Sequence, residues 1–466
     1  MPKKGEQMMA AERITEQITM VICEGGKYSS DIEKTVSAVR KSVVLDLIEL
    51  AGEVREIDEI ILMTNQPDLA DSAKKLGAAI SMDQEGSAFH LGERLSELIT
   101  GHKLHNVIYF GGGAAPLINK EDLTRMALAL KETKNVVISN NFVSSDFIAF
   151  TPATAINHIQ LPDIDNTLAK LLHQQAGLRM ELIESGLSTS YDIDTLIDVM
   201  VLGVQQRTGA RTRRTIRKLE FDFSKLEKAK QILINPEAEV LIYGRINPYP
   251  ISYISRNAKC RLRILMEERG MRALGRLERQ EVTSLLGYML KKGSLEEFFN
   301  MISDLCDCAF LDTRVLFAHL KMDLSKWDRF NSDLGYFDKI QNEFAREFTM
   351  QAENARIPII CGGNTLVNGG IWALLDAVNM EKLDLTSDEK IHRIVVELGS
   401  PIVGASLDTI INYLGIRVKV VATSDAFNTR IDPPLNQEIQ AGQVLYILGS
   451  QKSVNAFMEY VIGLTP

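Results

Sequence analysis

Cysteine is scarce in this sequence, with five residues of this type among 466. They are odd in number and scattered along the chain, which argues against a framework of disulfide bonds and favours a reducing compartment. Cys306 and Cys308 form the one close pair, and no second pair with zinc-like spacing accompanies them. Buried thiols are therefore the expected role, with a metal or redox pair as the alternative.

Long apolar runs are also lacking. No 18 consecutive residues are apolar, so no segment is expected to span a bilayer. The N-terminus has no apolar stretch of the kind found in secretory signals. We therefore expect a protein that stays in the cytoplasm.

An excess of positive charge is absent as well. The chain has 52 Lys and Arg residues against 61 Asp and Glu residues, and its formal net charge is -9. A general nucleic-acid binder needs a basic face, so direct binding to nucleic acid is not expected. The apolar content of 45% is ordinary for globular proteins, and the length predicts two to four domains.

Short apolar stretches alternate with helical stretches in two parts of the chain. The strand candidates are residues 18–23, 59–64, 107–111 and 136–139, and then 240–244, 260–266, 308–312 and 357–362. Strands separated by helices of this length predict parallel sheets with right-handed crossovers. After about residue 388 the apolar stretches become short, β-branched and alternating, which indicates a smaller α+β domain.

A basic stretch separates the two alternating parts. Six of the twelve residues from Arg207 to Lys218 are Lys or Arg. We interpret it as a linker or a solvated helix, with docking to an acidic partner or to phosphate as the alternative. The expected fold class is α/β, with two Rossmann-like parallel-sheet domains followed by a small α+β domain. The expected divisions are an N-terminal tail 1–17, a first α/β domain 18–205, a basic linker 206–230, a second α/β domain 231–385 and a C-terminal domain 386–466.

Glycines follow two strand candidates of the first domain, where free backbone N–H groups can meet an anion. Gly111, Gly112 and Gly113 follow one strand, and Gly25, Gly26 and Lys27 follow another. We treat both as candidate phosphate contacts. An ordinary α/β turn is the alternative for the 111–113 loop.

A polar cluster follows the strand candidate at 136–139. Asn141, Ser145 and Asp146 belong to it, and such positions bind ligands in α/β sheets. A base or sugar pocket is one interpretation. Turn and cap chemistry, which these residue types also favour, is the other.

The second α/β domain holds the densest glycine loop. Gly362, Gly363, Asn364 and Thr365 end a buried strand, and Gly369 and Gly370 precede an apolar helix. Such a loop lets the backbone approach a phosphate or nucleotide closely, although it lacks the Gly-Lys-Ser/Thr ending of a Walker loop. A tight structural turn is the alternative. Asp312, at the end of another strand, is the candidate functional acid of this domain.

The first domain resembles the MobA-like and CofC-like nucleotidyltransferase superfamily. The resemblance is carried by residues 43–78, by the stretch 112–123 (GGAAPLINKEDL) and by 191–202 (YDIDTLIDVMVL). It implies nucleotide binding and makes Asp192 and Asp194 candidate catalytic acids. Two features depart from the family: Ala114 occupies the place of the metal-holding aspartate, and the arginine expected after Gly25-Gly26-Lys27 is missing. Magnesium is therefore implied only if the transferase activity holds, and the metal is otherwise unknown.

The C-terminal residues 390–461 resemble the RCK C-terminal (TrkA-C) domain. Gly399-Ser400-Pro401, Gly404, Leu407, Pro433-Pro434 and the strand ending at Gly449 carry this resemblance, and Gln443 departs from the acid usual in the family. It implies a homodimer formed through this domain and small regulatory ligands such as nucleotides. It also implies a link to potassium or other cation transport through a membrane transporter partner. A module that only dimerises the protein is the alternative.

Two hypotheses follow. The first is a cytoplasmic regulatory protein that senses a nucleotide or another phosphorylated small molecule. The second is a nucleotidyltransferase that passes a nucleotide to a phosphorylated small molecule, with the C-terminal domain as its allosteric control.

Overall fold

The structure is a computed structural model, and it divides into two compact units, residues 1–377 and 378–466. It describes residues 17–26, 28, 30–83, 89–142, 144–183, 186–382, 390–416, 418–425, 429–449 and 451–463. Each unit is treated by itself below. Within the described residues, no helix is both long and apolar enough to cross a membrane.

The first unit begins with a seven-stranded sheet in the order β3-β2-β1-β4-β6-β5-β7. Its strands are β1 (Ile18–Cys23), β2 (Glu59–Thr64), β3 (Ala79–Met82), β4 (Asn106–Gly111), β5 (Val136–Ser139), β6 (Phe147–Thr151) and β7 (Arg179–Leu182). All neighbours pair in parallel except β6, which is antiparallel to β4 and β5. The strand order reverses between β1 and β4, which is where open α/β sheets bind ligands.

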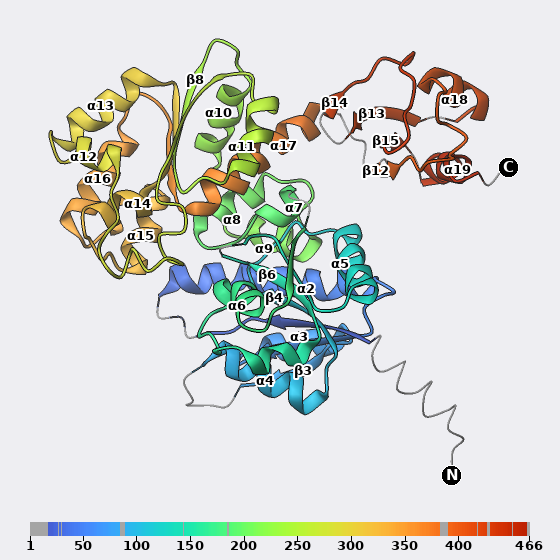
Figure 1. Cartoon of the computed structure of the whole chain (residues 1–466). Helices are drawn as coiled ribbons and strands as arrows, with labels where there is room; N and C mark the ends of the chain where they lie inside the picture. Colours follow the sequence, from blue (N-terminus) through green and yellow to red (C-terminus); the bar gives the residue numbers. More distant parts are fainter. Residues whose placement is uncertain are drawn as a thin grey trace. The chain divides into compact units, whose positions relative to one another are not determined.

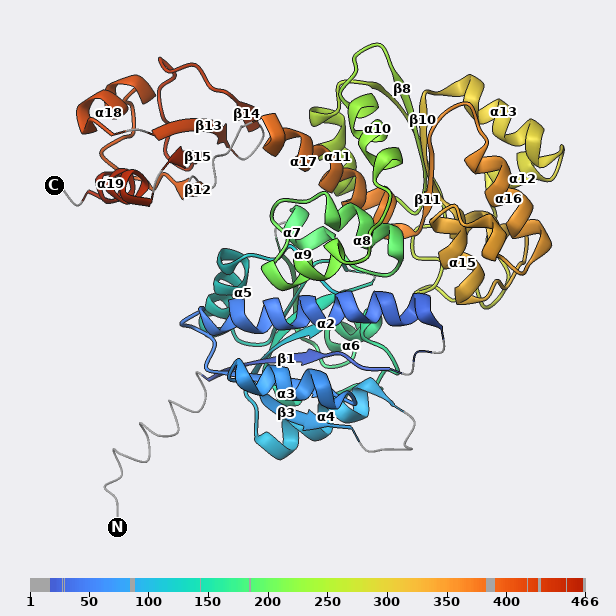
Figure 2. The same cartoon turned by 180° about the vertical axis from the view of Figure 1, so that it is seen from behind.

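Helices cover both faces of this sheet, and Figure 2 shows the longest, α2, lying along it. Its helices are α2 (Asp31–Gly52), α3 (Pro67–Lys75), α4 (Leu91–His102), α5 (Lys120–Glu132), η1 (Ala153–His158), η2 (Asp165–Thr167) and α6 (Leu168–Gln174). Buried residues of α2, α3 and α5 pack on one face, and those of α4, η1 and α6 pack on the other. Ser30 and Glu33 form a capping box that starts α2.

Three short helices, α7 (Leu187–Ser190), α8 (Leu196–Gly203) and α9 (Ala210–Arg217), lead toward a second sheet (Figure 1). The basic stretch forms α9, which packs on α2: Arg211 pairs with Glu49, and Asp46 accepts hydrogen bonds from the Arg211 and Thr212 backbone N–H groups. Because Arg211 binds the protein's own carboxylates, the stretch is a packed helix in this unit.

The second sheet has four parallel strands in the order β11-β10-β8-β9. Its strands are β8 (Glu239–Gly244), β9 (Arg261–Met266), β10 (Cys308–Asp312) and β11 (Ile359–Gly362). Its helices are α10 (Ser224–Leu233), α11 (Pro248–Asn257), α12 (Leu285–Leu290), α13 (Leu295–Leu305), α14 (Thr313–His319), α15 (Lys326–Asp333), η3 (Phe337–Lys339), α16 (Glu343–Glu353), the π-helical η4 (Leu366–Gly370) and α17 (Ile371–Lys382). Its order reverses between β8 and β10, so it too has a switch point of the kind at which open α/β sheets bind ligands.

One hydrophobic core joins the strands of the second sheet to α2, the helix that covers the first sheet, and to α8 and α17. Val39 of α2, Val199 of α8, Val240 of β8 and Leu374 of α17 are all buried in it. A shared core explains why the two sheets form one compact unit.

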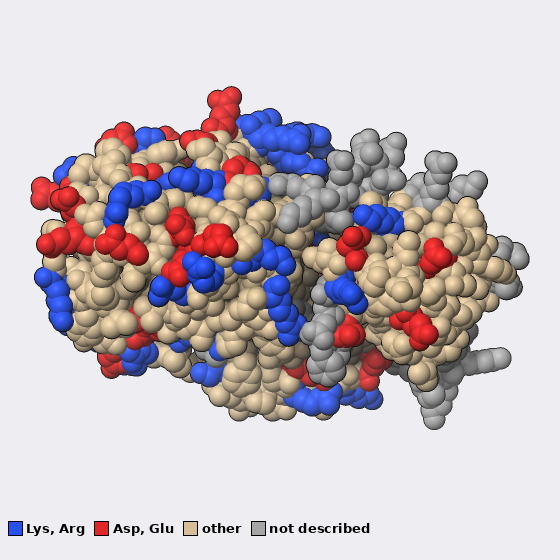
Figure 3. Space-filling model, turned by 90° about the horizontal axis from the view of Figure 1, so that it is seen from above, with Lys and Arg blue, Asp and Glu red and all other residues tan. Residues whose placement is uncertain are grey.

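On the face seen in Figure 3, cations and carboxylates are interspersed.

The second unit has a four-stranded antiparallel sheet in the order β12-β15-β13-β14. Its elements are β12 (Lys390–Val395), α18 (Leu407–Leu414), β13 (Val418–Ser424), β14 (Thr429–Ile431), β15 (Val444–Gly449) and α19 (Gln451–Val461). Ser406 caps α18, and Gly415 ends it in the left-handed conformation. The expected fold class is confirmed, with the refinement that the first sheet is mixed because of β6.

Candidate ligand-binding cleft

The first unit contains a cavity of about 610 Å³ between its two sheets, which we call the cleft. Residues that follow the carboxyl ends of β1, β8, β10 and β11 line it, namely Gly25, Gly26, Arg245, Arg314, Gly363 and Asn364. Each sheet therefore contributes its switch point to the same space. The volume is within the range of small-molecule sites.

The charges around the cleft are mostly positive. Among the described residues that line it, the cations are Arg40, Arg245, Arg272, Arg314, Lys326 and Arg329, and the carboxylates are Glu33, Asp194 and Asp323. We call Arg245, Arg272, Arg314 and Arg329 the arginine wall. All four belong to the part of the chain that builds the second sheet.

We call the two sides of the cleft the first-domain side and the second-domain side, after the first and the second sheet. The loop after β1 forms part of the first-domain side. Gly25 and Gly26 line the cleft, and the Gly26 N–H donates to Asn65 Oδ1 at 3.1 Å. Gly26 has φ +145°, which favours glycine. The predicted Lys27 lies outside the described residues. Two of the three predicted residues, Gly25 and Gly26, therefore lie at the cleft.

The loop after β4 is packed by the protein itself. A Cβ at Gly112 would overlap the carboxylate of Glu24, and one at Gly111 would lie 3.0 Å from Asp165 Oδ2. A Cβ at Gly113 would lie 2.9 Å from the Ile193 carbonyl oxygen. These glycines permit close packing, and the two carboxylates at this strand end disfavour an anion there.

The buried Glu24 pairs with Arg40, whose side chain is 34% exposed and lines the cleft. The Arg40 Nε donates to Glu24 Oε2 at 3.0 Å, and the phenol of Tyr28 donates to the other oxygen at 3.0 Å. Glu24 thereby orients both Arg40 and Tyr28 at the edge of the cavity.

Four aspartates gather behind this edge, and we call Asp146, Asp165, Asp192 and Asp194 the carboxylate cluster. Burial, followed by the charges of Asp194 and Asp146, raises the pKa of Asp192 well above its ordinary value. Burial raises the pKa of Asp146 to about 7, with Asp194 and Asp165 contributing. Only Asp194 lines the cleft, so the structure brings the two predicted catalytic acids together but exposes one of them to the cavity.

The position of the missing family aspartate lies beside this cluster. The backbone of Ala114 pairs with that of Asp192, and the Ala114 side chain is buried in the core. Within the described part of the chain, no group of three or more Asp, Glu, His or Cys residues could hold a metal ion. The carboxylates present therefore fit a divalent cation poorly.

The predicted polar cluster after β5 bonds mainly to its own surroundings. Asn140 donates to Asp146 Oδ2 at 2.7 Å, and the Ser145 N–H donates to the Asn166 carbonyl at 2.9 Å. Asn141 exchanges hydrogen bonds with Ser139. Such bonds are what the turn-and-cap interpretation predicts, and neither Asn141 nor Ser145 is among the cleft-lining residues.

On the second-domain side, Asp312 holds the side chain of Arg245 in place. Asp312 is fully buried, and it accepts from Arg245 Nε at 2.6 Å and from an Arg245 terminal nitrogen at 3.0 Å. This bidentate pair fixes a planar guanidinium at the cleft. The predicted functional acid is thus placed as the residue that positions Arg245.

Arg314 is held in the same way by Asp333. Its guanidinium makes two bonds to the Asp333 carboxylate, one of 2.6 Å, and Asp333 is fully buried at its side chain. Gly363 lies beside Arg314 with open space above it, since a Cβ there would meet nothing closer than 3.9 Å. Gly363 and Asn364 are the parts of the predicted glycine loop that reach the cleft.

The rest of that loop is packed. A Cβ at Gly369 would overlap the Ser190 carbonyl, one at Gly362 would lie 2.8 Å from Leu366, and one at Gly370 would lie 3.2 Å from the Thr365 carbonyl. Thr365 is 5% exposed. Asn368, in η4, donates to the Arg245 carbonyl at 3.0 Å and accepts from the Asn247 N–H. The loop therefore joins the cleft to the backbone that carries Arg245.

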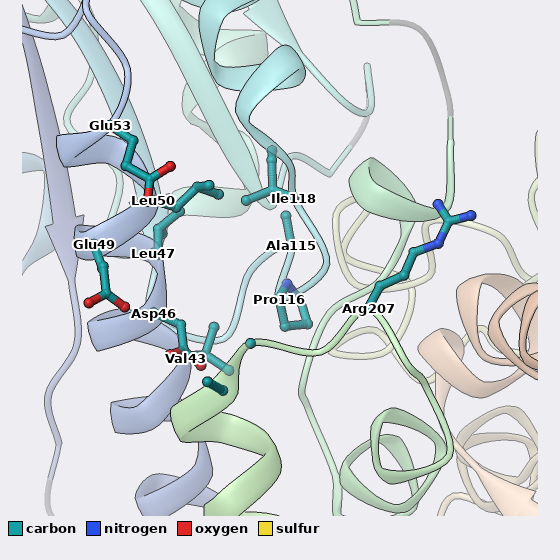
Figure 4. A pocket seen from close by; sticks show the side chains of 12 residues that line it. Val43, Asp46, Leu47, Glu49, Leu50, Glu53, Ala115, Pro116, Ile118 and Arg207 are labelled. Carbon is teal, nitrogen blue, oxygen red and sulfur yellow. The ribbon is translucent and has the colours of Figure 1, made fainter. Parts of the chain in front are cut away.

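A second, smaller cavity of about 220 Å³ lies between α2 and the loop of Ala115 to Ile118 (Figure 4). Its carboxylates are already engaged. Asp46 accepts from the start of α9, Glu49 pairs with Arg211, and Glu53 lies 4.0 Å from Lys120. It is separate from the cleft.

No family model matches the sequence, and no curated protein matches it. Solved structures do match. A cytidylyltransferase from Leptospira borgpetersenii is 15% identical, and the match covers 44% of this chain and 94% of that chain with a TM-score of 0.33. The RCK_C domain of S. agalactiae BusR, solved with c-di-AMP, is 18% identical over 16% of this chain and 95% of that chain, with a TM-score of 0.14.

The RCK C domain of the potassium transport protein KtrA, also solved with c-di-AMP, is 20% identical over 18% of this chain and 96% of that chain, with a TM-score of 0.16. These solved structures are of the two kinds that the sequence resembles, a nucleotidyltransferase and RCK C-terminal domains. Each likeness is one of fold.

Proposed function

We propose that the protein is a cytoplasmic regulatory sensor that binds a nucleotide or another phosphorylated small molecule in the cleft. One observation carries the proposal: the switch points of two sheets open into a single cavity of about 610 Å³ whose lining has twice as many cations as carboxylates. Switch points are the usual ligand sites of such sheets. Guanidinium groups match the geometry of phosphate oxygens.

A ligand in this cleft would contact both sheets at once. Any motion that changes the distance between the sheets would then change its affinity, and a sensor requires such a difference between two states. Gly363 and Asn364 also lie just before η4 and α17, and α17 runs into the C-terminal unit. Ligand contacts at this loop thus have a short covalent path to the RCK_C-like domain.

In this proposal, the RCK_C-like domain passes the signal of ligand binding to other proteins. It would form a homodimer and act on a partner protein, with a cation transporter as the partner class favoured by the sequence resemblance. The transporter in this proposal would be a separate membrane protein.

A cleft-filling variant tests ligand binding. A Cβ at Gly363 would point toward Arg314 and Thr195, which both line the cleft, at 3.9 and 4.0 Å. We expect ATP, GTP, CTP or UTP to raise the melting temperature of the wild type, because a ligand at a hundred times its Kd adds about 2.7 kcal/mol of stability. Gly363→Leu should abolish that rise.

Gly52→Leu is the matched control, because Gly52 ends α2 with no atom within 4 Å of an added Cβ. It should keep the full response. A wild type that no phosphorylated compound stabilises, or a Gly363→Leu variant that responds normally, would contradict the proposal.

Nucleotidyl transfer is the second candidate. It is favoured by the position of Asp194, which lines the same cavity as Gly25, Gly26 and Arg40. Magnesium-dependent pyrophosphate release from a nucleoside triphosphate, abolished by Asp192→Asn and Asp194→Asn, would establish this activity and replace the sensor interpretation. The absence of a three-residue metal group among the described residues leads us to expect no turnover.

A further inference from the structure

The arginine wall contains two cations that the protein does not neutralise. Arg245 and Arg314 are bound by the buried carboxylates of Asp312 and Asp333. Arg272 and Arg329 make no side-chain hydrogen bond or ion pair within the described residues, and the Arg329 Nε is buried without a partner.

We infer that Arg329 and Arg272, backed by Arg314, form a phosphate subsite on the second-domain side of the cleft. The inference rests on the proposed function and deepens it. The subsite would take the phosphomonoester or diphosphate end of the ligand, apart from the glycine loop after β1.

The charges that face Arg329 support an anion at this place. Burial lowers the pKa of Arg329, and repulsion from Arg314 and Arg272 lowers it further. Asp333 and Asp323 oppose this effect, but Asp333 is already bound by Arg314. A bound dianion would relieve the repulsion among these guanidinium groups and form charge-assisted hydrogen bonds with them.

The first-domain side of the cleft limits which chemical groups the rest of the ligand can carry. Asp194 presents a carboxylate there, whereas the Glu33 carboxylate accepts from Ser30 in the capping box and lies 3.5 Å from Lys326. Carboxylates repel a second phosphate and accept hydrogen bonds from hydroxyl groups. The ligand class is therefore a phosphorylated molecule with a hydroxyl-bearing portion, such as a nucleotide or a sugar phosphate.

Inorganic pyrophosphate is the probe for the subsite, because it lacks a base and a sugar. Titration calorimetry of the full chain would compare the wild type with Arg329→Met, Arg329→Lys and Arg346→Met. Arg346 is an exposed arginine of α16 outside the cleft and is the matched control. We expect Arg329→Met to bind about 10- to 100-fold more weakly, the loss for a charge-assisted hydrogen bond.

Arg329→Lys should recover part of the affinity, because it keeps the charge without the planar fork. Arg346→Met should bind like the wild type. The melting temperature without ligand should not fall in Arg329→Met, because the substitution removes a repelled cation. A lower melting temperature with unchanged pyrophosphate affinity would mean that Arg329 only supports the fold, and it would overturn the inference.

Two further outcomes separate this inference from the proposed function. Nucleotide stabilisation that survives Arg329→Met but not Gly363→Leu would overturn the subsite while the sensor stands. Pyrophosphate binding that depends on Arg329, in a protein that no nucleotide or sugar phosphate stabilises, would support the subsite and overturn the sensor. A wild type that does not bind pyrophosphate at millimolar concentration would overturn the subsite.

Discussion

The two sides of the cleft differ in the charged residues that they gather, which are aspartates on one side and arginines on the other. On the first-domain side, the carboxylate cluster lies behind the ends of β1 and β4, and its members raise one another's pKa. On the second-domain side, the arginine wall follows β8, β9 and β10 in the chain, and buried aspartates bind two of its four members. One side thus favours protons or hydroxyl groups, and the other favours anions.

This difference shows that a shared topology does not set the chemistry of a site. Both sheets offer a switch point to the same cavity, yet the residues that follow the strands give the two sides different roles. A ligand with one anionic end and one hydroxyl-bearing end suits both sides together. The predictions below test each side separately, from the largest expected effect to the smallest.

Removing a buried carboxylate should cost more stability on the second-domain side than on the first. Asp333→Ala leaves the Arg314 side chain, which is only 13% exposed, without its counter-ion. We expect a loss of about 3–5 kcal/mol in the free energy of unfolding, as for other broken buried pairs. Glu24→Ala leaves Arg40, which at 34% exposure can turn toward water, so about 1–2 kcal/mol is expected.

Urea unfolding would measure both losses, with Asp338→Ala as the control because this carboxylate is exposed in η3. The control should stay within about 0.5 kcal/mol of the wild type. Equal losses for Asp333→Ala and Glu24→Ala would refute the contrast between the two sides.

Two glycines of one loop should respond differently to the same substitution. A Cβ at Gly369 would overlap the Ser190 carbonyl and lie 2.9 Å from its carbon, so backbone must move. We expect Gly369→Ala to cost about 1–3 kcal/mol. Gly363→Ala has open space and should change stability by less than about 0.5 kcal/mol.

Thermal unfolding of the two variants would show this difference directly. If Gly363→Ala destabilised the protein as much as Gly369→Ala, the loop would be packed throughout. Gly363 would then not open into the cleft, and the second-domain side would lose its backbone approach to a ligand.

Much of the fold could be predicted from the sequence, because buried parallel strands read as short apolar runs between helices. The predicted strands at 18–23, 59–64 and 136–139 coincide with β1, β2 and β5. The antiparallel β6 was missed, because its residues follow a polar turn that we interpreted as loop.

The cleft was harder to predict, because its arginines are dispersed along the chain. No local sequence motif connects these arginines. They come together only because the loops of both sheets line one cavity, and they are Arg40, Arg245, Arg272, Arg314 and Arg329. A local signal existed at two of them: Arg245 follows Gly244 at the end of β8, and Arg314 follows Asp312-Thr313 at the end of β10. We assigned function to Asp312 there and overlooked the two arginines, one of which it holds in place.

The smallest expected effect concerns protonation in the carboxylate cluster. The pKa of Asp146 is raised from the ordinary 3.8 to about 7, first by burial and then by Asp194 and Asp165. The folded protein therefore keeps a proton that the unfolded chain has released between these pH values. The stability that this proton provides is fully present below about pH 4 and is lost as the pH rises through 7, at no more than about 1.4 kcal/mol per pH unit.

Asp146→Asn removes this titration, so its stability relative to the wild type should rise by up to about 1.4 kcal/mol between pH 5 and pH 6. Urea unfolding at the two pH values measures the change, and Asp338→Asn controls for the loss of one charge at an exposed position. A difference that stays constant, or that falls with pH, would mean that Asp146 is ionised in the folded protein. The carboxylate cluster would then carry more negative charge than we infer and could attract a divalent cation. That result would favour the transferase over the sensor, because the first-domain side would then supply the charge that nucleotidyl transfer needs.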